Sequence, residues 1–362
     1  MTSEPAANKP SDIRATAPDD YWKAFEDKWT SLLTYRYLGR EWGSLDNNVA
    51  DGHFMKLRHD MRNASGGIMA APLCVASPEC GGFNDNVVVP NPLIASMQIL
   101  DPAHGVKKLM ILPDNVHTGR RLGFSRALIV DADKPERVIA ISTGVGLSLG
   151  DVPEGYQKID NPPLNVVDSP DLPALHEVFG AQRISHGVWQ LPLLTDEMAS
   201  PDAALHIGPQ HIVLETASSE IAQALSSSPL QISDWYVMFV NRGKMGPFIT
   251  QGEAFVGTDG KIGTRMNLID MGDNQRVVST CAATFSPAHS YFWCRFSWYN
   301  QLKRHQKHRI RGAYLRSCAS CHAMTNGVRL RSDQRSRQPN HVAQQVPLGA
   351  ANRYPKEFDL RQ

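Results

Sequence analysis

The sequence has few cysteines and no long apolar run. Its 6 cysteines in 362 residues show none of the dense spacing that holds small secreted domains together. No stretch approaches the roughly 20 apolar residues that cross a bilayer, and residues 1–20 lack the apolar core of a secretory signal. We therefore expect a cytoplasmic protein with reduced thiols, no membrane span and no need of disulfides.

Neither sign of charge dominates, since the formal net charge is +1, but the charges are unevenly distributed. Residues 288–362 hold 14 Lys and Arg against 3 Asp and Glu, so the rest of the chain is acidic. This segment opens on aromatic residues and then loses all clear periodicity. A basic, aromatic tail can contact nucleic acid, but a solvated, disordered extension explains the composition more simply. We expect no nucleic-acid role.

One motif in this tail suggests a bound group. Cys318-Ala319-Ser320-Cys321-His322 matches the pattern of c-type haem attachment. That attachment takes place outside the cytoplasm, and the surrounding segment offers no apolar haem pocket. A zinc site would need further ligands, and the segment has no second closely spaced pair of ligands. We expect neither haem nor zinc, and no metal elsewhere in the chain.

Two stretches of the chain read as antiparallel meanders, because runs of Val, Ile and Leu alternate with tight-turn residues at 86–150 and again at 230–285. A helix-like segment precedes each, at 66–76 and 206–225. A further amphipathic helix is predicted near the N-terminus, where Trp22, Phe25 and Trp29 follow helical spacing.

The two meanders also share turn chemistry. Asp131 precedes Arg137 by six residues, and Asp270 precedes Arg276 by the same interval. We interpret this as a duplication, with both pairs serving the fold. The predicted organisation is a leader at 1–20, modules at 21–165 and 166–287, and a tail at 288–362.

The second copy carries the more specific pattern. His206-Ile207-Gly208-Pro209 is followed by Glu215, nine residues after the histidine. Over about residues 30–287 the chain resembles the hotdog-fold acyl-CoA thioesterases of the phenylacetate type (PaaI-like). The resemblance implies an α+β fold of two tandem hotdog modules, each an antiparallel sheet wrapped around a central helix, related by a pseudo-twofold axis. The first copy has Ser65-Gly66-Gly67, with Cys74 at the position taken as equivalent to Glu215.

The resemblance implies one composite site per chain. Glu215 is expected to activate water or to attack a thioester carbonyl itself, while the amides of Gly66 and Gly67 hold the oxyanion. Gly208 and His206 would shape the facing loop, as in the family. Ser219, one turn after Glu215, is expected to hold the water or the carboxylate.

The function expected from these residues is hydrolysis of an acyl-CoA thioester to a carboxylic acid and coenzyme A. Arg120 and Arg121 could pair with the coenzyme A phosphates, although a solvated turn fits them equally well. No cofactor is expected beyond the coenzyme A of the substrate, and two chains could associate as a homodimer. The alternatives are a non-catalytic acyl-CoA-binding protein and, ranked below it, a protein resembling the enoyl-CoA hydratases.

Overall fold

The computed structural model describes residues 10–38, 53–83, 87–154 and 166–288. They all lie in the first of two compact units, Met1–Ser290. The predictions made for the first nine residues, for the tail after residue 288 and for the Cys318 to His322 motif fall outside the described residues.

The N-terminal segment is helical, as predicted. It forms a short 3-10 helix η1 (Ile13–Ala15), α1 (Pro18–Ser31) and α2 (Leu33–Tyr37), with extended backbone at Leu32 separating α1 from α2. Pro18 starts α1 with a suitable φ, and the two aspartates of its first turn are favoured by the helix dipole. The apolar face of α1 builds an aromatic cluster separate from the main core.

The first module then follows the predicted order of a helix and a meander. Its elements are β1 (His53–Lys56), η3 (His59–Met61), α3 (Ala70–Ala76), β2 (Val88–Ile99), β3 (Lys108–Thr118), β4 (Leu122–Asp131) and β5 (Lys134–Asp151). Helix α3 ends early because Ser77 precedes Pro78, and the residue before a proline disfavours helical backbone.

The second module repeats this order with a longer helix. Its elements are α4 (Leu175–Val178), β6 (Gln182–Ser185), β7 (Val188–Leu191), η4 (Asp196–Met198), α5 (Ile207–Gln223), β8 (Leu230–Phe239), β9 (Phe248–Val256), β10 (Ile262–Asp270) and β11 (Arg276–Pro287). The predicted helix at 206–225 and the predicted meander at 230–285 are confirmed.

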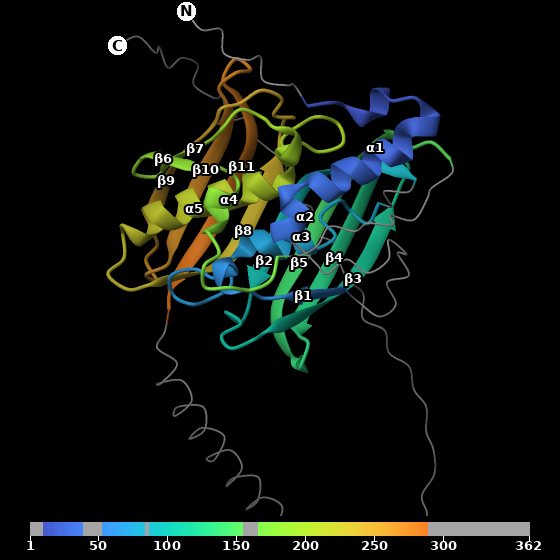
Figure 1. Ribbon diagram of the computed structural model, residues 1–362. Helices are drawn as coiled ribbons and strands as arrows, with labels where there is room; N and C mark the ends of the chain where they lie inside the picture. Colours follow the sequence, from blue (N-terminus) through green and yellow to red (C-terminus); the bar gives the residue numbers. More distant parts are fainter. Residues whose placement is uncertain (1–9, 39–52, 84–86, 155–165, 289–362) are drawn as a thin grey trace, which may run out of the picture. The chain divides into compact units, whose positions relative to one another are not determined.

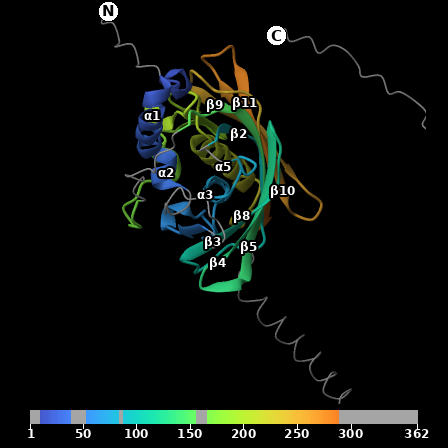
Figure 2. The ribbon, with the colours of Figure 1, turned by 90° about the vertical axis from the view of Figure 1, so that its right-hand side faces the viewer.

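The eleven strands of the described residues belong to one antiparallel sheet, in the order β1-β3-β4-β5-β2-β8-β11-β10-β9-β7-β6. The modules join where β2 pairs with β8, so neither strand is left as an open edge. In Figure 1 the helices lie in front of the sheet, and Figure 2 shows α3 and α5 next to its curved face with α1 and α2 farther out.

Backbone hydrogen bonds give the register of the repeat. The N–H of Met69 donates to Met61 just before α3, and that of His206 donates to Met198 just before α5. Met69 therefore matches His206, which makes Cys74 the counterpart of His211 and Pro78 the counterpart of Glu215. The predicted equivalence of Cys74 and Glu215 is wrong by one helical turn, because the glycines of the first copy lie in the loop before α3 and do not begin the helix.

The strands at the junction follow a twofold relation. The N–H of Leu100 donates to Ile139 and that of Val240 donates to Val278, which matches β2 with β8. In this register Ser96 is the counterpart of Tyr236, and these two residues are also paired across the junction. The pseudo-twofold axis therefore passes between them, with α3 and α5 on either side.

Glycines on β5 allow the chain that follows α3 to lie directly on the sheet. A Cβ atom at Gly144 would lie 2.6 Å from the Cα of Glu79, and one at Gly146 would lie 1.9 Å from the carbonyl oxygen of Cys80. A side chain at either position would push this segment away. The glycines thereby fix the place of Glu79, a buried acid on the helix side of the sheet.

Candidate functional site

Glu215 lies at the junction of the two modules. Its carboxylate accepts hydrogen bonds from the backbone N–H groups of Ala70 (2.9 Å to Oε1) and Ala71 (2.7 Å to Oε2). These are the first two residues of α3, whose N-cap residue Met69 provides no side-chain hydrogen bond. The acid of one module therefore meets the helix N-terminus of the other, where the helix dipole favours negative charge.

Burial and hydrogen bonding act in opposite directions on the pKa of Glu215. The side chain is only 1% exposed, and burial raises its pKa to about 7, against the lowering effect of the two amides. Raised pKa values of this kind are common for catalytic acids and bases, because a base acts best when its pKa is near the working pH.

The amides at this carboxylate are not those of the two predicted glycines. The N–H of Gly66 donates to the carbonyl of Asn63, and the N–H of Gly67 donates to the side chains of Asn63 and Ser65. Both are used inside their own loop, where Gly66 has a φ of +78° that favours glycine. The N–H groups that contact Glu215 are therefore those of Ala70 and Ala71 and not those of Gly66 and Gly67.

The other predicted site residues are dispersed. Gly208 lies in the first turn of α5, where a Cβ atom would meet the Thr34 hydroxyl of α2 at 2.4 Å, so it serves close helix packing. Ser219 is half-buried one turn beyond Glu215 and has no side-chain hydrogen bond to any other described residue. Arg120 and Arg121 are exposed in the turn between β3 and β4.

A second buried acid, Glu79, was missed in the sequence. Its Oε2 lies 3.0 Å from Nε2 of His211, and Nδ1 of His211 accepts a hydrogen bond from the Trp235 indole at 3.1 Å. Because Nδ1 is an acceptor, the proton of the neutral imidazole is on Nε2 and is donated to Glu79. Burial raises the pKa of Glu79, and its Oε1 is buried with no hydrogen-bond partner.

The two acids occupy related places in the repeat. Glu79 follows Pro78, the counterpart of Glu215. His211 and Glu215 lie one turn apart on α5, where Glu215 contacts the first residues of α3 and His211 contacts Glu79, three residues after the end of α3. Alignment of the repeat on Pro72 and Pro209, each the third residue of its helix, is the sequence signal that could have revealed Glu79.

We expect the hydrogen bond of Glu79 to matter more than its charge. In Glu79→Gln the amide oxygen can still accept from His211 while the buried charge is removed, so the free energy of unfolding should stay within about 1 kcal/mol of wild type. In Glu79→Ala the imidazole N–H loses its acceptor, at a cost of roughly 2–3 kcal/mol. Urea unfolding of both variants measures the difference. An equal loss in the two variants would show that the charge itself is needed.

Neither a metal cluster nor a membrane helix is found in the part of the chain that the structure describes. No group of three or more His, Cys, Asp or Glu side chains there could hold a metal ion. None of the helices described has the length and apolar character needed to span a bilayer. Cys74 and Cys281 are free thiols.

The sequence matches no family model and no curated protein. Among solved structures it is similar to the acyl-CoA thioesterase II TesB2 of Mycobacterium marinum, with 13% identity over 68% of this chain and 98% of that one, at a TM-score of 0.43. A candidate thioesterase II of Thermobifida fusca YX has 12% identity over 71% and 97% of the two chains, at 0.45. A conserved hot dog fold protein of Alicyclobacillus acidocaldarius has 12% identity over 67% and 97%, at 0.41.

Proposed function

We propose that this chain is a tandem double hotdog that hydrolyses an acyl-CoA thioester to a carboxylic acid and coenzyme A. The observation that supports the proposal most directly is the Glu215 carboxylate, buried at the module junction and held by the amides of Ala70 and Ala71. It combines a base or nucleophile with oxyanion donors in one place, and both are needed for acyl transfer. The reaction requires no metal.

Two routes fit this arrangement. In the first, Glu215 removes a proton from a water molecule, whose oxygen adds to the thioester carbonyl carbon. In the second, Glu215 itself adds to that carbon and forms an anhydride, which water then cleaves. In both routes the negative charge that develops on the carbonyl oxygen is stabilised by an α3 amide, the C–S bond breaks, and the coenzyme A thiolate takes up a proton.

In the structure the Glu215 carboxylate accepts hydrogen bonds from both amides. The carbonyl oxygen of a reacting thioester therefore has to displace the carboxylate from one of them. The carbonyl oxygen would accept from Ala70 or Ala71 while the other amide keeps hold of Glu215. Both donors belong to the first turn of α3 and are buried together with Glu215, so the exchange requires rotation of the Glu215 side chain and opening of this contact to the substrate.

A second candidate, acyl-CoA binding without hydrolysis, is favoured by the same contact. A carboxylate that satisfies two helix N-terminal amides is also what a purely structural cap would do. Such a protein would bind acyl-CoA and release no product. The coenzyme A contacts of Arg120 and Arg121, a homodimer and a cytoplasmic location also remain proposals.

The two candidates are separated by offering the protein a panel of acyl-CoA esters. Release of the coenzyme A thiol is followed with a thiol reagent, and binding is followed by the shift in unfolding temperature. The proposed function requires product release with at least one ester. Thermal stabilisation by an ester together with no release from any member of the panel would favour binding alone.

A further inference from the structure

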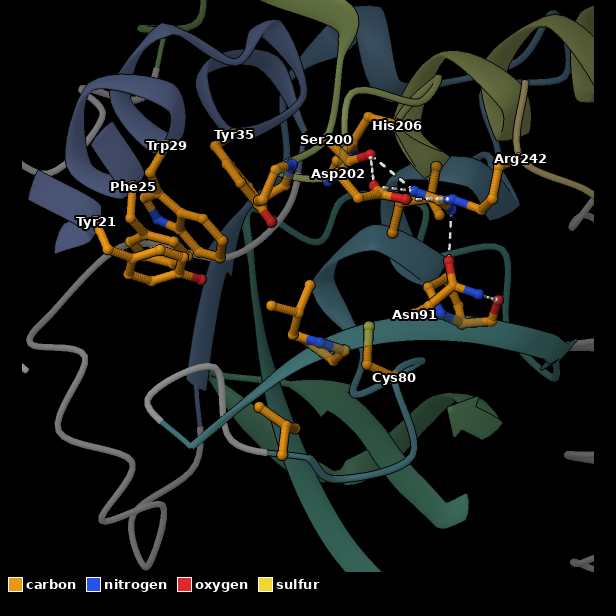
Figure 3. A pocket seen from close by; sticks show the side chains of 16 residues that line it. Tyr21, Phe25, Trp29, Tyr35, Cys80, Asn91, Ser200, Asp202, His206 and Arg242 are labelled. Atoms are coloured by element: carbon orange, nitrogen blue, oxygen red, sulfur yellow. Dashed lines mark hydrogen bonds and ion pairs between the residues drawn. The ribbon is translucent and has the colours of Figure 1, made fainter. Parts of the chain in front are cut away.

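A cavity of about 90 Å³ lies between α1 and the first turn of α5, away from the Glu215 contact. By this measure one water molecule needs about 10–15 Å³, so the cavity has room for a group of several heavy atoms. Figure 3 shows aromatic rings on one side of it, and Asp202, Arg242 and Asn91 on the other.

The aromatic side is built by the N-terminal helices. The rings of Tyr21 and Phe25 stack at 6.3 Å between centroids, those of Phe25 and Trp29 at 5.0 Å, and Trp29 lies 4.1 Å from Tyr35. All four line the cavity. A wall of stacked rings favours a flat, apolar group, because a further ring can stack on it or meet it edge-on.

The opposite side of the cavity is polar and is organised around the guanidinium group of Arg242. Arg242 is fixed by Asp202 (Nε to Oδ2 2.8 Å) and by the Ser200 hydroxyl (2.8 Å), and it also donates to the Asn91 side chain. Arg242 lowers the pKa of the buried Asp202 to about 2, so this pair is charged at neutral pH.

The charged side chains that line this end of the cavity are one cation and one carboxylate, Arg242 and Asp202. Of the cations nearby, Arg14 pairs with Asp12, and the Asp270 carboxylate accepts from the backbone N–H of Lys244. Recognition of an anion at this end therefore depends on hydrogen-bond donors and not on net charge.

His206 adds a donor with a fixed tautomer. Its Nδ1 accepts from the N–H of Gly208 at 3.4 Å, and burial together with Arg242 lowers the pKa of the imidazole to about 3. The neutral ring therefore carries its proton on Nε2. His206 lines the cavity and is 7% exposed, and no other described residue accepts a hydrogen bond from Nε2.

We propose that this cavity is a second ligand site and that it binds an aromatic monocarboxylate. The ring of the ligand packs against Phe25 and Trp29. Its carboxylate accepts from Nε2 of His206 and lies near Arg242. The site stands on residues of its own, apart from the Glu215 carboxylate, so it does not depend on the proposed hydrolysis.

Calorimetric titration of the full chain with benzoate tests the proposal. We expect saturable binding of one benzoate, weakened about tenfold or more in Trp29→Ala, which removes a wall of the cavity. Trp22→Ala is the matched control, because it removes the same ring from the same helix and Trp22 does not line the cavity. Its affinity should stay within about threefold of wild type.

Further titrations test whether the ring and the carboxylate of the ligand are both needed, and whether binding is independent of Glu215. Benzamide and hexanoate should each bind more weakly than benzoate. His206→Asn, which keeps a side chain able to cap α5, should weaken benzoate binding, whereas Glu215→Gln should not. Absence of saturable binding, equal losses in Trp22→Ala and Trp29→Ala, or equal affinity for benzoate and benzamide would overturn the proposal.

Discussion

Replacing Glu215 by Gln is expected to lower acyl-CoA hydrolysis by about 1,000-fold, as is usual for loss of a catalytic base or nucleophile. The glutamine side chain has nearly the same shape and can still accept from one of the two α3 amides. It cannot accept a proton from water, and it is a poor nucleophile. The variant should therefore keep its fold and its affinity for acyl-CoA while losing turnover.

The matched control is Glu220→Gln, the same change five residues along the same helix. The Glu220 carboxylate bonds to Arg183, Gly187 and the Trp189 indole, away from α3. Hydrolysis should stay within about threefold of wild type in this control. Full activity in Glu215→Gln, measured with the ester that wild type cleaves best, would exclude Glu215 from the chemistry.

The stability of the protein should depend on pH through the same residue. The pKa of Glu215 is raised from 4.5 to about 7 in the folded state, so the folded protein retains a proton that the unfolded chain has lost. The stabilisation is complete below pH 4.5 and is lost as pH rises to about 7. The gap between the two pKa values corresponds to roughly 3 kcal/mol for this fully buried group.

The test compares wild type with Glu215→Gln at each pH by urea unfolding. The free energy of unfolding of wild type should fall by roughly 3 kcal/mol relative to the variant between pH 4.5 and 8. His206, whose pKa is lowered to about 3, acts in the opposite direction, since below pH 6.5 the unfolded chain takes up a proton that the folded protein does not. It is present in both proteins and cancels in the difference. Parallel curves for the two proteins would mean that Glu215 is already ionised in acid.

The alternation of apolar runs and turn residues was sufficient to predict both meanders and the long helix α5. Local signals determined these elements: β-branched runs end at Asp131 and at Asp270, and α5 has no helix breaker in its interior. The sequence did not predict the break at Leu32. Nor did it predict the true start of α3, because Gly66 and Gly67 suggested a helix entrance that lies three residues later, at Ala70.

The sequence drew attention to Glu215 but did not predict the groups that it contacts. Glu215 was singled out by its position nine residues after His206, in the motif that carries the resemblance. The facing amides depend on how α3 meets α5, a contact between residues 144 or more positions apart in the sequence. Glu79 was missed for a related reason, since its burial depends on the glycines of β5 on which its segment lies.

The most direct test of the account is the dependence of kcat/KM on pH for the acyl-CoA ester that the protein hydrolyses best. The ionised carboxylate is the form that acts as base or nucleophile, and the pKa of Glu215 is about 7. We therefore predict a rate that rises about tenfold per pH unit below neutrality and levels off above it. A rate that stays flat from pH 5.5 to pH 8.5 would show that Glu215 does not carry the reaction.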